Sequence, residues 1–509
     1  MPHSILTIQL QKLLKKAYTR RKFLKKVTLA TATAITTSLV SPRLPVNSQN
    51  PPHVAIVGSG LAGLNAAYQL QKNGIKATVY EANNRLGGRV ISITSRVGKD
   101  LVSDLGGSFI NVNHQDMLSL IDDFQLKLFN RNEHAESLDY PLVKYYLDGR
   151  SLSEAELVEA LTPIATQIGE DADLIYSDYE GFAPDFDKLS VTEYLDKHSD
   201  KITVTFVRTL LENIIRTEYG VEPEESSALQ LLFISPRVED DNVNLLGEND
   251  ETYVIKEGTN QLIDSLAQVL TGQINLNKRL NALNKQGNKY LLTFTDNQIV
   301  EADWVILALP ISNLKKIDIQ VDLPAQMRRY LEEVNLGNND KLIAGFNQRI
   351  WLQSEGFSQE IWTDLGFSAA WNETQRQTEI TEGALTFFYG GQEVIPLPGM
   401  MTRVEGNNRV EQLNRIIPGI QGLANQRFVK TQWTSNPLSQ GSYTSFKPGQ
   451  LTEFSEFFYV EEDGEISQEV RVDQLIFAGE NFSDEFYGYM NGAAQTGRLA
   501  AQIIIREIG

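Results

Sequence analysis

Residues 53–90 constrain the fold of this chain more than any other segment. They read HVAIVGSGLAGLNAAYQLQKNGIKATVYEANNRLGGRV. An apolar run at 54–57 leads into Gly58-x-Gly60-x-x-Gly63, a helical pattern follows, and a second apolar run at 77–80 ends at Glu81. This order of strand, glycine turn, helix and strand predicts a Rossmann-type βαβ unit that binds a dinucleotide.

Each small or acidic residue in this unit has a physical reason. Gly58 permits the tight turn, Gly60 lets a pyrophosphate approach the backbone, and Gly63 lets the helix pack on the strand. The amides of the first helical turn then face the phosphate charge. Glu81 is placed to accept hydrogen bonds from both ribose hydroxyls. A purely structural glycine turn is the alternative, and it leaves the flanking strands and the acid unexplained.

Composition limits the possible partners. A chain of 509 residues builds two or three large cores, so a multi-domain enzyme is expected. The net charge is −19, and because the first 50 residues carry nine Lys and Arg and no acid, the remainder carries −28. This argues against nucleic acid and suits a cationic small molecule, although solubility alone also accounts for an acidic surface. The chain has no cysteine, and its five histidines show no metal-ligand spacing, so no metal site is expected.

The first 49 residues are expected to be a targeting signal and linker. Residues 19–25 read TRRKFLK, and a mildly apolar run follows at 27–40, which is short for a membrane span. The pattern predicts export by the twin-arginine machinery to a periplasm or thylakoid lumen. Either cleavage within 41–49 or retention as a membrane anchor fits the sequence. The alternative is a basic amphipathic helix on a membrane or partner.

The remaining chain is expected to form two domains from interleaved segments. A cofactor domain takes residues 50–130, 251–322 and 431–509, and a substrate domain takes 131–250 and 323–430. Alternating apolar residues predict strands at 273–277, 290–294 and 304–309. Helices are expected at 261–270 and 491–507, and a buried strand is expected to end at Gly479-Glu480. The segment 131–250 is expected to be largely helical.

Five motifs together resemble the flavin-containing amine oxidase family, which includes monoamine, polyamine and L-amino-acid oxidases. They are the glycine turn with its extension to Gly87-Gly88-Arg89, the run DLGGSF at 104–109, the run LGNNDK at 336–341, Trp433 followed by GSY at 441–443, and Gly479-Glu480 followed by GYMNGA at 488–493. The resemblance covers most of the chain after residue 50 and is weak in 131–250. It implies an α/β fold, with a discontinuous Rossmann-type FAD-binding domain and an inserted mixed α+β substrate domain.

The resemblance also implies which residues hold FAD. Ser442 stands where several monoamine oxidases carry the cysteine that attaches their flavin, so FAD is expected to be noncovalent. Arg89 is expected to pair with the pyrophosphate, Glu480 to meet the ribityl–phosphate region and Trp433 to pack beneath the flavin. Leu280 is either an adenine contact or a core leucine. The full set is Gly58, Gly60, Gly63, Glu81, Gly88, Arg89, Gly106, Gly107, Ser108, Leu280, Trp433, Gly479, Glu480 and Met490.

Three further residues are expected to serve catalysis. Amine oxidation removes a hydride equivalent from the carbon that bears nitrogen, and the amine must be neutral so that its lone pair stabilises the developing imine. Tyr443 and Tyr489 resemble the family's aromatic cage, which guides the amine to the flavin and tolerates its charge on arrival. Lys341 resembles the family lysine that holds a water against the reactive flavin nitrogen. Desolvation lowers the pKa of the amine.

The expected activity is oxidative deamination of a primary amine or polyamine to an imine or aldehyde, with electrons passed to dioxygen or to another acceptor such as a quinone. The alternative is an oxidase or dehydrogenase for basic L-amino acids such as arginine or lysine. Residues 106–113 contain no arginine to clamp a substrate carboxylate, which favours an amine. A carotenoid or protoporphyrinogen desaturase and a non-enzymatic chaperone of lipidated proteins are more distant alternatives on the same scaffold.

Overall fold

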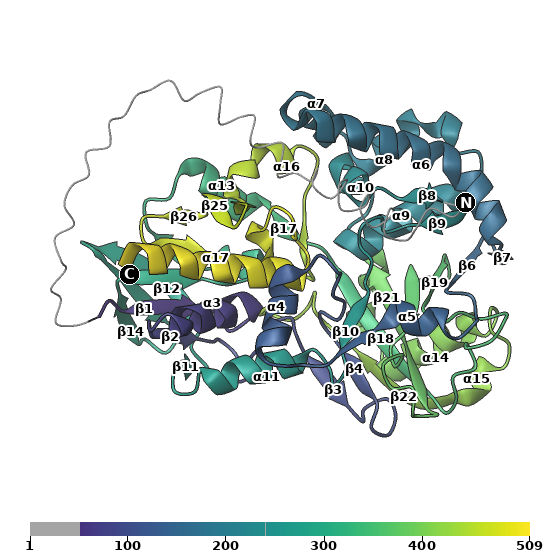
Figure 1. The fold of residues 1–509 in the computed structure, drawn as a ribbon, viewed down its shortest axis with the longest axis horizontal. Coiled ribbons are helices and arrows are strands. Elements are labelled where there is room, and N and C mark those ends of the chain that lie inside the picture. The colour runs from purple at the N-terminus through teal and green to yellow at the C-terminus, as the bar shows by residue number, and fades with distance from the viewer. Residues whose placement is uncertain (1–50, 240, 509) are drawn as a thin grey trace, which may run out of the picture.

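The computed structural model describes residues 51–239 and 241–508, which form two lobes side by side (Figure 1). One lobe is built on a six-stranded sheet and is called the Rossmann lobe here. The second lobe is built on a seven-stranded sheet with a group of helices above it. The predicted twin-arginine signal, residues 1–49, lies outside the described residues.

The Rossmann sheet has the strand order β11-β2-β1-β15-β27-β26. Strands β1 and β15 lie at its centre, pair in parallel and are buried along their whole length, which is typical of a parallel sheet covered on both faces. The bounds are β1 Val54–Val57, β2 Ala77–Tyr80, β11 Ile274–Asn275, β15 Trp304–Leu307, β26 Arg471–Val472 and β27 Leu475–Phe477. Its strands therefore come from all three segments predicted for the cofactor domain.

Two long helices cover one side of this sheet. Helix α3 (Leu61–Lys72) follows β1, and helix α17 (Met490–Ile508) packs against it although the two are far apart in sequence (Figure 1). Helix α11 (Asn260–Val269) also packs against α3. A separate four-stranded sheet contacts β15 through β13 and has the order β14-β13-β12-β16, with bounds β12 Leu280–Gln286, β13 Lys289–Phe294, β14 Ile299–Ala302 and β16 Asp318–Gln320.

The second lobe combines both segments predicted for the substrate domain in one sheet, of order β22-β18-β21-β20-β19-β6-β7. All eight residues of β18 are buried between β21 and β22, and this strand carries Lys341. The bounds are β6 Val143–Leu147, β7 Arg150–Leu152, β18 Asn339–Phe346, β19 Glu360–Thr363, β20 Ala369–Asn372, β21 Gly383–Gly390 and β22 Ala424–Lys430. The pair β6 and β7 adds strands to a segment for which the sequence predicts mainly helix.

Helices form the layer above this sheet in Figure 1. Helices α6 and α8 begin at the capping boxes of Ser153 with Glu156 and of Ser190 with Glu193, which satisfy backbone amides at each N-terminus. Helix α9 ends at Gly220, whose φ of +65° is the left-handed conformation that closes many helices. The bounds are α6 Glu154–Ser177, α7 Tyr179–Asp187, α8 Val191–Lys197, α9 Thr205–Tyr219 and α10 Ala228–Ile234.

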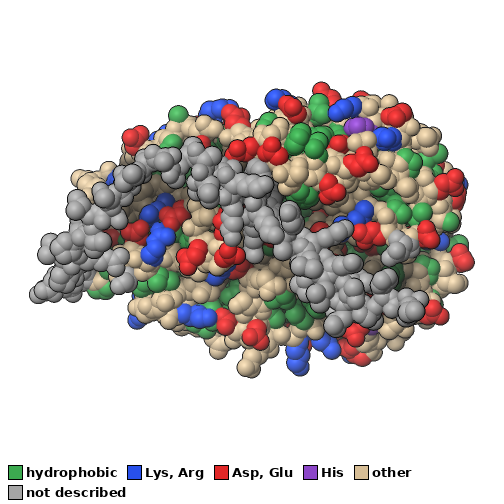
Figure 2. Space-filling view, turned by 45° about the horizontal axis from the view of Figure 1, so that its top comes forward, with side chains coloured by type: hydrophobic (Ala, Val, Ile, Leu, Met, Phe, Trp, Pro, Cys, Tyr) green, Lys and Arg blue, Asp and Glu red, His purple; other side chains and the backbone are tan. Residues whose placement is uncertain are grey.

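The charge of the visible surface is consistent with the net negative charge of the sequence. Figure 2 shows acidic side chains spread across the visible face of both lobes, with basic side chains set among them. Within residues 51–239 and 241–508, no helix combines the length and the apolar character that crossing a membrane requires.

Candidate active site

One large cavity, with a volume of about 2830 Å³, extends from the glycine turn of the Rossmann lobe to the sheet of the second lobe. Its lining includes all but one of the site residues predicted from the sequence. The exception is Gly63, which packs against the turn instead. The predicted residues that line the cavity are Gly58, Gly60, Glu81, Gly88, Arg89, Gly106, Gly107, Ser108, Leu280, Lys341, Trp433, Tyr443, Gly479, Glu480, Tyr489 and Met490.

The glycine turn is shaped for a dinucleotide. Gly58 has a φ of +103°, and a Cβ atom on Gly63 would lie 2.0 Å from the Gly58 carbonyl oxygen, so α3 closes tightly on the turn. A Cβ atom on Gly60 would meet nothing within 4 Å, because this position faces the cavity at the start of α3. The turn therefore offers backbone amides and free space where a pyrophosphate must approach.

The Glu81 carboxylate is held in place at the end of β2. Its Oε2 accepts hydrogen bonds from the Ser59 amide at 2.9 Å and the Ser59 hydroxyl at 2.6 Å, and its Oε1 accepts one from the Asn83 amide at 2.7 Å. A carboxylate has about four lone-pair sites, so capacity remains for a ribose hydroxyl. Leu280, at the start of β12, is buried and lines the same end of the cavity.

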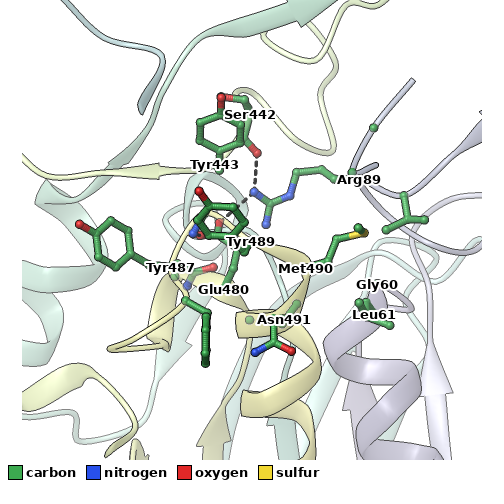
Figure 3. Close-up of a pocket in the computed structure, with 18 of the residues that line it drawn as sticks. Gly60, Leu61, Arg89, Ser442, Tyr443, Glu480, Tyr487, Tyr489, Met490 and Asn491 are labelled. Atoms are coloured by element: carbon green, nitrogen blue, oxygen red, sulfur yellow. Dashed lines mark hydrogen bonds and ion pairs between the residues drawn. The ribbon is translucent and has the colours of Figure 1, made fainter. Parts of the chain in front are cut away.

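Arg89 connects three of the predicted motifs. Its Nη1 donates to the Ser442 carbonyl at 2.5 Å and to Glu480 Oε1 at 2.9 Å (Figure 3). Glu480 Oε2 in turn accepts from the Gly488 amide at 2.8 Å. The structure thus pairs Arg89 with Glu480, and the expected contact of Arg89 with a pyrophosphate stays a prediction.

Lys341 binds the run at 104–109 across the cavity. Its Nζ donates to the Gly106 carbonyl at 2.7 Å, the Ser108 hydroxyl at 3.0 Å and the Asp104 carbonyl at 3.1 Å. These acceptors use all three N–H groups of an ammonium, so a water at Nζ would have to replace one of them. Burial lowers the pKa of Lys341. Trp433 reaches the same run, because its Nε1 donates to the Leu105 carbonyl at 3.0 Å.

The two predicted cage tyrosines are anchored on the last turn of α9. The Tyr443 hydroxyl donates to the Thr217 carbonyl, and the Tyr489 hydroxyl donates to Glu218 Oε2 at 3.1 Å. Their rings face the same part of the cavity (Figure 3). Burial raises the pKa of both phenols well above the ordinary value, so both are neutral at physiological pH.

His114 supports this cage, although the sequence gives it no site role. Its ring lies edge-on to Tyr489 with centroids 5.2 Å apart, and it lines the cavity. Its Nδ1 accepts a hydrogen bond from the Asn111 amide at 3.1 Å. Burial lowers the pKa of His114 to about 3, so the ring is neutral.

Three carboxylates line the cavity beside the tyrosines: Glu218, Glu251 and Glu360. Burial raises the pKa of Glu218 to about 7 and that of Glu251 to about 8, and it also raises the pKa of Glu360. Glu251 Oε2 lies 3.3 Å from Arg131 Nη1, and the Trp362 indole donates to Glu360 at 2.8 Å. The described residues contain no cluster of metal-ligand side chains.

Comparison with known proteins assigns the chain to a family. Residues 61–505 match the family described as flavin containing amine oxidoreductase. The chain belongs to this family. The amine oxidoreductase is 24% identical over 479 residues to the flavin-containing amine oxidase of Oncorhynchus mykiss, covering 91% of this chain and 88% of that one. It is 23% identical over 469 residues to the human flavin-containing amine oxidase B, covering 90% and 86%.

Solved structures share the fold of the amine oxidoreductase. Cyclohexylamine oxidase from Brevibacterium oxydans IH-35A has a TM-score of 0.72 at 20% identity and covers 90% of this chain and 99% of its own. Wild-type putrescine oxidase bound to putrescine has a TM-score of 0.70 at 22% identity, covering 89% and 99%. The predicted α/β fold with a Rossmann-type FAD domain is therefore confirmed.

FAD is the cofactor of this amine oxidoreductase, and the cavity fits it. The open position at Gly60 and the fixed carboxylate of Glu81 suit the pyrophosphate and ribose of its adenosine half. The part of the cavity between the glycine turn and the tyrosine cage is lined by Arg89, Glu480 and Met490. The chain has no cysteine, so a cysteinyl thioether to the flavin is excluded.

The sequence does not reveal the acids or His114 as site residues. Glu218, Glu251 and Glu360 come from α9, from the chain before β10 (Tyr253–Ile255) and from β19, and no local motif surrounds them. Two of the three lie at or next to the segment 131–250, where the family resemblance is weak. Only the folded chain brings them to one cavity.

Proposed function

We propose that this amine oxidoreductase oxidises a primary amine that carries a second positive charge, that is, a diamine or polyamine. The observation that carries the proposal is the set of carboxylates Glu218, Glu251 and Glu360 beside the tyrosine cage. Glu251 pairs with Arg131, whereas neither Glu218 nor Glu360 forms an ion pair among the described residues. A substrate with two ammonium groups supplies positive charge to Glu218 and Glu360.

The electrostatics of the acids support a cationic substrate. Burial disfavours the ionised form of each carboxylate, and the charges of Glu360 and Glu218 raise the pKa of Glu251 further. A bound ammonium offsets this repulsion and lowers those pKa values again. Binding of the dication is therefore coupled to proton release from the carboxylates.

The chain's own residues prepare the reacting amine. FAD, when bound, accepts the hydride equivalent. The neutral phenols of Tyr443 and Tyr489 flank the amine and exclude water, which favours loss of its proton. Glu218, whose pKa is about 7 and whose Oε2 holds the Tyr489 hydroxyl, takes that proton. Lys341 holds the run at 104–109 in place.

The second candidate is oxidation of a basic L-amino acid. The same carboxylates suit the side-chain cation of arginine or lysine. Such a substrate also needs a cation for its own carboxylate. Arg131 lies behind Glu251 and is bonded to it, and Arg237, which lines the cavity, pairs with Glu239 and Glu248. Because both guanidinium groups are already paired with acids, an amine is the preferred substrate class and a basic amino acid is the second candidate.

A substrate panel tests the proposal. Turnover is measured with putrescine, spermidine, phenylethylamine and arginine for the native enzyme, Glu360→Gln and the control Glu355→Gln, which removes a charge from an exposed position. We expect Glu360→Gln to raise the KM for putrescine about tenfold, equivalent to about 1.4 kcal/mol, and to leave phenylethylamine unchanged. Better turnover of monoamines than of diamines, unaffected by Glu360→Gln, would reject the proposal, and preferred turnover of arginine would establish the second candidate.

Dioxygen is our proposed electron acceptor, with a quinone as the alternative. Both accept electrons from reduced flavins, and the names of the similar proteins, amine oxidase and cyclohexylamine oxidase, favour dioxygen. Peroxide detection during turnover, run beside an artificial acceptor under anaerobic conditions, separates the two. Peroxide formed in proportion to the amine consumed supports dioxygen, and turnover only with the artificial acceptor supports the quinone.

We also propose export through the twin-arginine route, on the sequence of residues 19–40 alone. A protein that carries FAD benefits from a route that moves folded chains, because the cofactor is loaded before crossing. Cell fractionation of the native chain and of a variant with Arg20→Lys and Arg21→Lys tests this. Unchanged localisation of the variant would reject it.

A further inference from the structure

A buried hydrogen-bond network lies behind Lys341, with Glu373 at its centre. Glu373 Oε2 accepts from the Trp371 indole at 2.9 Å and from the Thr386 hydroxyl at 2.7 Å. Glu373 Oε1 accepts from the Asp104 amide at 2.7 Å. The Glu373 side chain is only 3% exposed, so these bonds form in a medium where charges interact strongly.

Two partners of Glu373 are also partners of Lys341. The Asp104 peptide donates its N–H to Glu373, while its carbonyl accepts from Lys341 Nζ at 3.1 Å. The Trp371 ring lies 5.2 Å from Nζ, within the range of a cation–π contact, and Glu373 fixes that ring through the indole N–H. Glu373 therefore orients two of the groups around the ammonium without touching it.

The charges around Lys341 give Glu373 a second role. The charged groups that face the ammonium are Glu373, Asp104, Glu251 and Arg376. Asp104 Oδ2 is bonded to Arg376 Nη1 at 2.6 Å, whereas the same guanidinium stays 3.6 Å from Glu373. The positive charge of Arg376 therefore offsets the negative charge of Asp104 more than it offsets that of Glu373. Burial lowers the pKa of Lys341, and Glu373 is the strongest of the charges that oppose this effect.

We propose that Glu373 is a positioning residue that keeps Lys341 protonated and fixed against the run at 104–109. It acts through the Asp104 peptide and the Trp371 ring and by its own charge. The proposal concerns every amine that this family member oxidises, so it is independent of the diamine proposal above.

The test measures the protonation of Lys341 in the FAD-loaded enzyme. Competitive acetylation read by mass spectrometry gives the pH at which Lys341 becomes a reactive neutral amine, and a pH titration of turnover gives the matching kinetic inflection. For Glu373→Gln we expect both to move to lower pH by about one unit. The control Glu379→Gln removes the charge of an exposed acid six residues away and should move neither. Lys341→Met should abolish the kinetic inflection.

Two further variants separate charge from folding. Glu373→Asp keeps the charge, so its acetylation midpoint should stay closer to the native one than that of Glu373→Gln. Trp371→Phe keeps an aromatic ring but removes the hydrogen bond to Glu373. Its acetylation midpoint for Lys341 should move to lower pH by less than that of Glu373→Gln. An unchanged midpoint for Lys341 in Glu373→Gln overturns the proposal. If that variant does not fold, Trp371→Phe decides, and an unchanged midpoint there overturns it.

Discussion

At the scale of single residues, Glu218 links the charge of the cavity to the aromatic cage. Its carboxylate accepts from Tyr489, and its neighbour Thr217 accepts from Tyr443. Burial raises its pKa to about 7, which suits the proposed role of a proton acceptor near physiological pH. No motif in the sequence marks this residue. The site roles of the glycines and tyrosines are predictable because family motifs surround them. The role of Glu218 follows only from its contact with Tyr489, 271 positions away.

Glu218→Gln should change the pH profile of amine oxidation. In the native enzyme we expect kcat/KM to fall as pH drops through about 7, because the carboxylate that is proposed to take the proton becomes protonated. The amide cannot take a proton, so this limb should disappear and kcat/KM at pH 8 should fall about a hundredfold. Glu224→Gln, at an exposed position of the same segment, is the control. A variant that binds FAD and retains the limb near pH 7 would remove Glu218 from this role.

At the scale of elements, sequence pattern predicts strands whose apolar residues are continuous, as in β1, or alternate regularly, as in β13. Strands β1 and β15 are buried along their length and are predicted correctly. Strand β12 reads LNALNKQ and buries only Leu280 and Leu283, so its apolar alternation is too weak for the sequence to predict a strand there. The predicted strand at 304–309 ends earlier, at Leu307, because the chain leaves the sheet before Pro310. Strands β6 and β7 join the second-lobe sheet through pairings that the local sequence does not encode.

The end of helix α9 gives a prediction at this scale. Gly220 has a φ of +65°, and a Cβ atom there would lie 2.2 Å from Asn339 Oδ1 and 2.6 Å from the Asn338 amide nitrogen. Gly220→Ala should therefore lower the free energy of unfolding by more than the roughly 1–2 kcal/mol that left-handed backbone costs. It should also raise the KM for amines, because Thr217 and Glu218 precede this turn.

Gly74→Ala is the matched control, since Gly74 has a φ of +77° and a Cβ atom there would meet nothing within 4 Å. Thermal unfolding and amine kinetics check both variants. Equal losses of stability in the two would show that the contact of α9 with the start of β18 contributes nothing beyond backbone strain.

At the scale of the whole molecule, the cavity spans the interface of two lobes that each take strands from distant segments. The Rossmann-type fold and dinucleotide binding follow from the sequence because the βαβ unit is contiguous, and the five family motifs indicate FAD. The arrangement of the cavity does not, because Lys341 of β18 reaches the run at 104–109 only after both sheets have formed. Glu81 and the turn at Gly60 face one end of the cavity, and the cage lies at the other, so a bound FAD contacts elements from several segments.

Removal of FAD should therefore lower the stability of the whole molecule, and FAD alone should restore it. A ligand present at a hundred times its Kd stabilises the folded state by about 2.7 kcal/mol, which thermal unfolding detects. FMN lacks the adenosine half that the Gly60 turn and Glu81 are shaped to hold, so it should restore little of the lost Tm. Glu81→Ala should weaken the recovery with FAD and leave the small effect of FMN unchanged. Equal recovery with FMN and FAD would show that the βαβ unit does not hold the adenosine half, and the assignment of Gly58, Gly60 and Glu81 would then be wrong.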